Sequence, residues 1–258
     1  MFIKAEFVLY LIIFLALCAP ALSQMTADDW FDQATNSYNS GFYESAIKYF
    51  DKVLEMRPAD TSALINKGNA LSLSGRYEEA IASYDRAIQI NPNDTAVFIN
   101  KGLALGSLGN YSLALDAFDR AIELNDNSTD AWVDRGNILM AQSRYDDAIA
   151  AFSKATIINP QLSNAWYNMG IALSERSRFE EAITAFDNVI RINPQDKDAW
   201  QAKGNMLSDL GRFEQAISAY DNATKIDPQY SDAWNNKGVA LKALNRNAEA
   251  DEAFAKAG

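Results

Sequence analysis

The sequence predicts an all-α solenoid of seven helix-turn-helix units, each 34 residues long. Three observations lead to this fold class. A glycine recurs every 34 residues, with a large apolar residue four positions before it, and an alanine and an aromatic residue 12 and 16 positions after it. Proline closes most units, and it ends a helix because it has no amide donor. The recurring glycines are Gly68, Gly102, Gly136, Gly170, Gly204 and Gly238.

Residues 1–23 precede the repeats and differ from them in composition. Lys4 is followed by an apolar run from Phe7 to Ala19, and then by small residues that end at Ser23. This order predicts a secretory signal peptide that is cleaved after Ala21 or Ser23, so that the mature protein is exported. Three alternatives remain open: an uncleaved membrane anchor, a lipid on Cys18, and a buried helix of the folded domain.

The units themselves predict pairs of antiparallel helices. Within a unit the apolar residues are three and four positions apart, which is the period of a helix face. Trp200, Leu207 and Leu210 share one stripe, Phe213 begins a second, and Gly211 lies in the break between them. A first copy contains Trp30, Ala46, Phe50 and Pro58, with Ala34 in place of the glycine. The units therefore begin near residues 27, 61, 95, 129, 163, 197 and 231, and they cover residues 27–258.

The Trp–Gly–Ala–aromatic–Pro series resembles the tetratricopeptide repeat family over about residues 27–258. The resemblance implies a right-handed superhelical solenoid, in which the first helices line a concave groove that binds peptides or partner proteins. Two departures are Asp126, which stands where the other units have proline, and Ala34.

Composition argues against catalysis. The chain has no histidine, one cysteine (Cys18) and a net charge of −11. Without histidine or a mature thiol, most catalytic arrangements are excluded, and so are most metal sites. The loop Asn125–Asp130 is rich in oxygen ligands but lacks the glycine and the distant glutamate of a calcium loop. The acidic balance disfavours nucleic acid as a partner. We expect no enzyme activity, no metal or other cofactor, no small-molecule substrate and no nucleic-acid partner.

The candidate groove residues lie on one face of each first helix, at positions around the glycine. Three positions before the glycine the residues change from apolar to polar along the chain: Ile65, Ile99, Val133 and Tyr167, then Gln201 and Asn235. Six positions before it, Asp130, Asp198 and Asp232 make that rim acidic. One position after it, asparagine alternates with apolar residues: Asn69, Leu103, Asn137, Ile171, Asn205 and Val239.

Two positions before the glycine, asparagine recurs at Asn66, Asn100, Asn168 and Asn236. This series is similar to the asparagine ladder of O-linked N-acetylglucosamine transferase, which holds the backbone of an extended peptide. Asparagine suits that role because its amide both donates and accepts. Asp32, Asp134 and Ala202 interrupt the series, and the alternative is a set of merely hydrated polar positions. The basic residues one position before the glycine, among them Lys67, Lys101, Arg135, Lys203 and Lys237, point off this face, which argues against a carboxylate clamp.

The last unit differs from the others in its second helix. Asp251 stands where earlier units have Ile149, Ile183 or Ile217, and the printed chain stops at Gly258. We expect this helix to act as a polar lid that leaves the protein monomeric.

The function that we predict is an exported scaffold that binds a protein or peptide segment in the groove. The rival hypothesis is a structural or assembly component of an envelope or cell-surface complex that uses the convex face.

Overall fold

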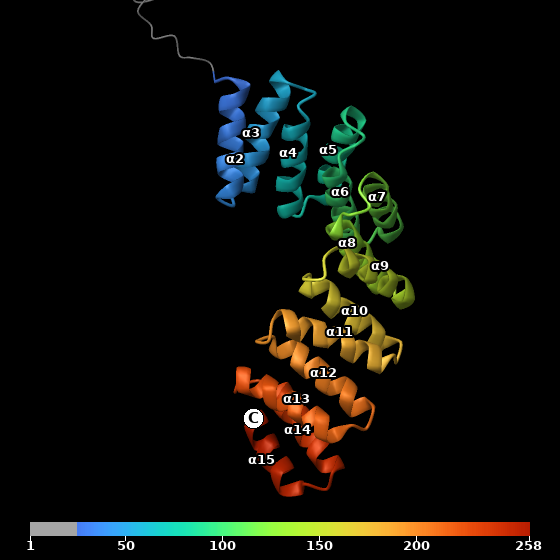
Figure 1. Ribbon diagram of the computed structural model, residues 1–258. Coiled ribbons are helices and arrows are strands. Elements are labelled where there is room, and N and C mark those ends of the chain that lie inside the picture. The colour runs from blue at the N-terminus through green and yellow to red at the C-terminus, as the bar shows by residue number, and fades with distance from the viewer. Residues whose placement is uncertain (1–24) are drawn as a thin grey trace, which may run out of the picture. The chain divides into compact units, whose positions relative to one another are not determined.

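The computed structural model describes residues 25–258, which form α-helices joined by short turns (Figure 1). The predicted signal peptide lies outside the described residues. Contacts divide the chain into two compact units, the first ending at Ile90 and the second covering Asn91–Gly258. The described residues hold fourteen helices that fit the predicted seven helix-turn-helix repeats, so the all-α repeat fold is confirmed.

The first unit contains two hairpins, α2(Ala27–Asn39) with α3(Tyr43–Met56), and α4(Thr61–Leu73) with α5(Tyr77–Ile90). The second unit contains five: α6(Thr95–Ser107) with α7(Tyr111–Leu124), α8(Thr129–Ala141) with α9(Tyr145–Ile158), α10(Ser163–Glu175) with α11(Phe179–Ile192), α12(Lys197–Asp209) with α13(Phe213–Ile226), and α14(Ser231–Ala243) with α15(Asn247–Ala257). Within each unit, every helix packs against the next one along the chain.

Local sequence explains where the helices begin and turn. Five first helices start after a side chain that accepts a bond from an amide of the helix: Thr26, Asp60, Asp94, Ser128 and Asp196. The residue that reverses the chain inside each hairpin has a positive φ, between 55° and 78°. Four hairpins use glycine there, which adopts this conformation at no steric cost. The other three use Ser143, Ser177 and Asn245.

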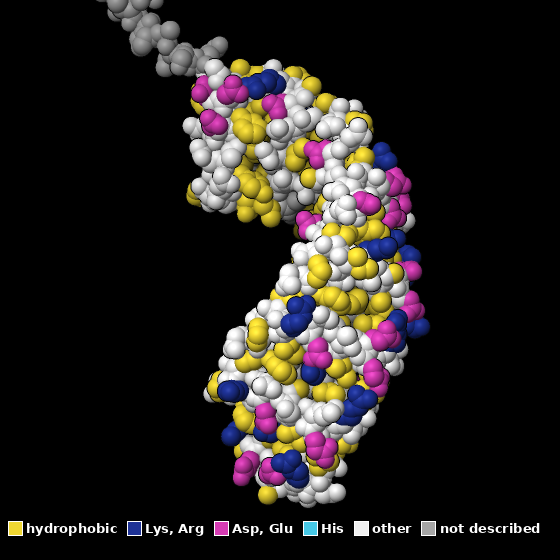
Figure 2. All heavy atoms as spheres, in the orientation of Figure 1, with side chains coloured by type: hydrophobic (Ala, Val, Ile, Leu, Met, Phe, Trp, Pro, Cys, Tyr) yellow, Lys and Arg dark blue, Asp and Glu magenta, His cyan; other side chains and the backbone are white. Residues whose placement is uncertain are grey.

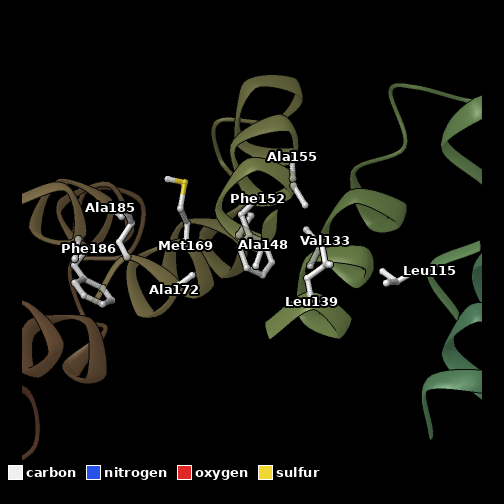
Figure 3. Packing of buried hydrophobic residues seen from close by; sticks show 14 residues of the cluster. Leu115, Val133, Leu139, Ala148, Phe152, Ala155, Met169, Ala172, Ala185 and Phe186 are labelled. Atoms are coloured by element: carbon white, nitrogen blue, oxygen red, sulfur yellow. The ribbon is translucent and has the colours of Figure 1, made fainter. Parts of the chain in front are cut away.

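The repeat glycine is required by close packing. A Cβ added to Gly136 would lie 2.5 Å from Cε1 of Phe152, and the same contact recurs in the other glycine-bearing repeats. Phe152 and its counterparts Tyr84, Phe118, Phe186 and Tyr220 are at most 1% exposed. Figure 3 shows Phe152 beside Ala148, and Phe186 near Ala185, within the core of the second unit.

The other recurring residues tie the repeats together. The indole N–H groups of Trp132, Trp166, Trp200 and Trp234 donate to the carbonyl oxygen six residues earlier, at 2.9–3.1 Å. The basic residue before the glycine pairs with an aspartate 16 residues earlier, as in Arg135–Asp119 and Lys203–Asp187, both at 2.6 Å. These ion pairs turn the basic side chains toward the preceding second helix.

Candidate functional site

The candidate site is the face of the first helices that carries the two asparagine series. We call it the ladder face and define it by the residues six, three and two before the repeat glycine and one, four and five after it. These positions project to one side of a helix. In the second unit the helices concerned are α6, α8, α10, α12 and α14.

Most of the predicted groove residues are partly accessible. Asn137 is exposed, whereas Asn168, Asn205, Asn236, Asn100, Ile99 and Tyr167 are half-buried. In the first unit Ile65, Asn66 and Asn69 are half-buried as well. Val133 differs from these, because it is only 6% exposed and belongs to the core cluster of α8–α11. Its side chain therefore contributes to packing, and it offers almost no surface to a ligand.

The two asparagine series meet across neighbouring repeats. Asn168 Nδ2 donates to Asn137 Oδ1 at 2.9 Å, and Asn236 Nδ2 donates to Asn205 Oδ1 at 3.0 Å. The Tyr220 hydroxyl also donates to Asn205 Oδ1, at 2.9 Å. Helical spacing predicts the two series separately and does not predict these pairs. Comparison of each copy with the preceding one would reveal them, because the partners are 31 residues apart.

Each pair orients its amides and still leaves groups for a ligand. An asparagine has two N–H donors and an oxygen with two lone pairs. The bond between Asn168 and Asn137 occupies one donor of the first and one lone pair of the second. The remaining donors and acceptors are those that a peptide backbone requires, and they are held in a restricted orientation before binding.

Between the two pairs, the asparagines are replaced by apolar residues. Where α10 meets α12, the positions equivalent to the paired asparagines are Ile171 and Ala202. Both are half-buried and, with Met206, pack against the core cluster. The ladder face of the second unit thus alternates between an asparagine pair and an apolar step.

An open cavity of about 370 Å³ lies at the C-terminal pair, between α12 and α14. Its lining residues are Asn205, Met206, Ser208, Asp209, Tyr220, Asn236 and Val239. Val239 is 54% exposed, so the cavity offers both amide groups and apolar surface to a ligand.

Carboxylates dominate the charge of this face. Asp134 is half-buried, and its burial, reinforced by the charge of Asp130, raises its pKa to about 6. The Tyr230 hydroxyl donates a hydrogen bond to Asp198 Oδ1 at 2.7 Å and also contacts the side-chain amide of Gln201. Burial, this hydrogen bond and the charge of Asp198 raise the pKa of Tyr230.

The opposite side carries two related cavities. One of about 330 Å³ lies among α9, α10 and α11, and one of about 360 Å³ lies among α11, α12 and α13. Ile149, Trp166 and Thr184 of the first are replaced by Ile183, Trp200 and Ser218 in the second, so the lining repeats with the 34-residue period.

No group of acidic, cysteine or histidine side chains within residues 25–258 is arranged to hold a metal ion. In the same part of the chain, no helix is long and apolar enough to cross a membrane.

Comparison with known proteins agrees with the repeat architecture. Residues 15–258 match the family model described as the cilia and flagella-associated protein 70 C-terminal domain. No curated protein matches the chain.

Solved structures extend the likeness. YrrB, described as a tetratricopeptide repeat protein with an unusual peptide-binding site, is 26% identical, with a TM-score of 0.61 over 67% of this chain and 90% of YrrB. The C-terminal part of a repeat protein from Cytophaga hutchinsonii is 17% identical, with a TM-score of 0.77 over 88% of this chain and 93% of its own. A repeat protein from Parabacteroides merdae is 19% identical, with a TM-score of 0.66 over 90% and 91%. The last two likenesses concern the fold alone.

Proposed function

Because this chain belongs to the tetratricopeptide repeat family represented by the cilia and flagella-associated protein 70 C-terminal domain, we propose that it is a non-catalytic scaffold that binds an extended peptide or protein segment along the ladder face. One observation carries the proposal: the asparagine pairs Asn137–Asn168 and Asn205–Asn236 present pre-oriented amide donors and acceptors at regular steps. A peptide backbone has one donor and one acceptor per residue, so such a row binds an extended chain regardless of its side chains.

Two further observations support this mode of binding. The cavity between α12 and α14 places exposed Val239 beside the pair Asn205–Asn236, so a side chain and its backbone are accommodated together. YrrB, the 26% identical relative, is described as having a peptide-binding site. The lack of histidine supports a non-catalytic role, since a general acid–base group is most often histidine.

The protein acts outside the cytoplasm in this proposal. The support is the apolar run from Phe7 to Ala19 with small residues after it. The mass of the protein purified from its native cells tests this: a chain that starts near Leu22 or Gln24 supports export. An intact Met1 in soluble cytosolic material contradicts it.

The binding mode is tested with the purified protein and a random peptide library. Peptides that are enriched on the immobilised protein are labelled, and their affinities are measured by fluorescence anisotropy. Asn168→Ala with Asn236→Ala should weaken binding about tenfold, since each lost hydrogen bond is worth ~0.5–1.5 kcal/mol. The helical circular dichroism signal should stay unchanged, because both side chains are half-buried and neither belongs to the apolar core.

The repeated cavities on the opposite side favour a second candidate, an assembly component that binds partners through α9, α11 and α13. Thr184→Arg with Ser218→Arg fills these cavities and leaves the ladder face intact. If the arginine variant abolishes binding of the selected peptides and the asparagine variant does not, the assembly role replaces the groove.

A further inference from the structure

The ladder face of the second unit carries charge of one sign. Its carboxylates are Asp130, Asp134, Glu175, Asp198, Asp209 and Asp232. Four of the five first helices contribute at least one of them, and all but Asp134 are exposed. The basic residue at a ladder-face position of this unit is Lys242. Its ammonium lies 5.0 Å from the centre of the Phe254 ring.

The ion pairs of this unit lie elsewhere. The basic side chains of this unit that form ion pairs do so with acids off the ladder face, for example Arg178 with Glu181, and Lys237 with Asp221. Figure 2 shows acidic and basic side chains side by side over α7 and α9. None of the ion pairs found among residues 91–258 uses one of the six ladder-face carboxylates. The six carboxylates therefore concentrate negative charge without forming an ion pair among these residues, and Lys197, which pairs with Asp227, lies near enough to Asp198 for their charges to interact.

The spacing of the asparagine pairs sets a register for the ligand. The pair Asn137–Asn168 joins α8 to α10, and the pair Asn205–Asn236 joins α12 to α14, two repeats further on. Packed helices are ~10 Å apart, so two repeats span ~20 Å. An extended chain in the polyproline II conformation advances ~3.1 Å per residue with three residues per turn, which gives about six residues from one pair to the next and places every third side chain on the same side. Ile171, Ala202 and Met206 form the apolar step midway.

We propose that the ladder face of the second unit selects an extended peptide in the polyproline II conformation, with basic side chains about six residues apart and an apolar side chain midway between them. The asparagine pairs bind the backbone, Ile171 and Ala202 contact the apolar side chain, and the carboxylates pair with the lysine or arginine side chains. The inference rests on the proposed function and adds the chemistry of the partner. It also gives a role to six carboxylates that form no ion pair among residues 91–258.

The probes are synthetic fluorescein-labelled peptides that contain three lysines and two leucines in alternation. Two serines separate each lysine from the next leucine, so the lysines are six residues apart. Reference peptides carry glutamine or glutamate in place of every lysine. We expect the lysine peptide to bind about tenfold more tightly than the glutamine peptide, and the glutamate peptide to bind least. The preference should shrink as salt is raised, because exposed charges are screened within ~10 Å at 0.1 M.

Two matched variants locate the charge that is responsible. Asp130→Asn with Asp198→Asn and Asp232→Asn neutralises three ladder-face acids, and should weaken lysine-peptide binding about tenfold. The control combines Asp116→Asn, Glu214→Gln and Glu252→Gln, which neutralise three exposed acids of second helices that form no ion pair among residues 91–258. It changes the net charge equally and should alter the affinity less than about twofold.

Each outcome decides a different point. Equal affinity for the lysine and glutamine peptides, or equal weakening by the two triple variants, overturns the charge inference. If library peptides depend on Asn168 and Asn236 but are not basic, the proposed function stands and the charge inference fails. If the lysine peptide depends on the carboxylates and not on the asparagines, the proposed backbone binding fails.

Discussion

Replacement of the repeat glycine by alanine measures how closely the helices of a hairpin approach each other. In Gly136→Ala the new Cβ would lie 2.5 Å from Cε1, 2.8 Å from Cζ and 2.9 Å from Cδ1 of Phe152. Carbon atoms in contact prefer separations of ~3.5–4.0 Å, so the ring must move by about 1 Å. Phe152 is fully buried.

The expected cost follows from two opposing effects. Overpacking of a buried core costs ~1–3 kcal/mol, whereas alanine gains about 1 kcal/mol of helix propensity over glycine. We therefore expect a net loss of up to about 2 kcal/mol for Gly136→Ala, the difference between these two terms. Urea unfolding followed by circular dichroism and tryptophan fluorescence measures this loss.

Gly106→Ala is the matched control in the same unit. Its Cβ would meet the terminal methyl of Ile138 at 2.7 Å, and that half-buried side chain can rotate away. We expect this variant to be as stable as wild type, or more stable by up to about 1 kcal/mol. Gly238→Ala should cost less than Gly136→Ala, because its partner Phe254 is partly exposed.

A double-mutant cycle identifies the contact that is responsible. Phe152→Leu removes the edge of the ring and destabilises by itself through a cavity. Combined with Gly136→Ala, it should cost less than the sum of the two single changes, by about 1 kcal/mol. The packing argument is refuted if Gly136→Ala is as stable as Gly106→Ala, or if the two changes are additive.

Three further predictions concern single residues. Ser177→Gly should stabilise the second unit by about 0.5–1 kcal/mol, because Ser177 has a φ of 55°, which glycine adopts freely; a lower urea midpoint would contradict this. Asp134→Asn should stabilise by about 1–2 kcal/mol at pH 7 and by little at pH 4. The carboxyl of Asp134 has a pKa of about 6 in the folded state, above its unfolded value, so the stability of the wild type falls as pH rises from 4 to 6. A difference in urea midpoint between Asp134→Asn and wild type that does not change with pH would refute this sign. Asp251→Ile should make a monomeric protein associate, because Asp251 is exposed on α15, and isoleucine at this position packs against the following repeat in earlier units. Sedimentation velocity measures the association. A variant that stays monomeric would contradict the prediction that α15 is a polar lid.

Much of the fold follows from the sequence because its determinants are local and periodic. The recurrence of Gly136 and its counterparts, with Phe152 and its counterparts 16 residues later, predicts both helices of each hairpin and the face on which they meet. The first helices begin at residues 27, 61, 95, 129, 163, 197 and 231, where the repeat pattern places them. A helical period and a helix-starting side chain are visible within a few residues of sequence, so these features require no knowledge of neighbours.

The candidate site was only partly predictable. Helical spacing assigned Val133 and Asn168 to the same kind of surface, but the tertiary structure buries the first and joins the second to Asn137. A helical period predicts the direction in which a side chain points from its own helix. It does not predict whether a neighbouring repeat covers that side chain. The asparagine pairs, the apolar step at Ile171 and the raised pKa of Asp134 were therefore decided by the stacking of successive first helices, which brings together residues about one repeat apart.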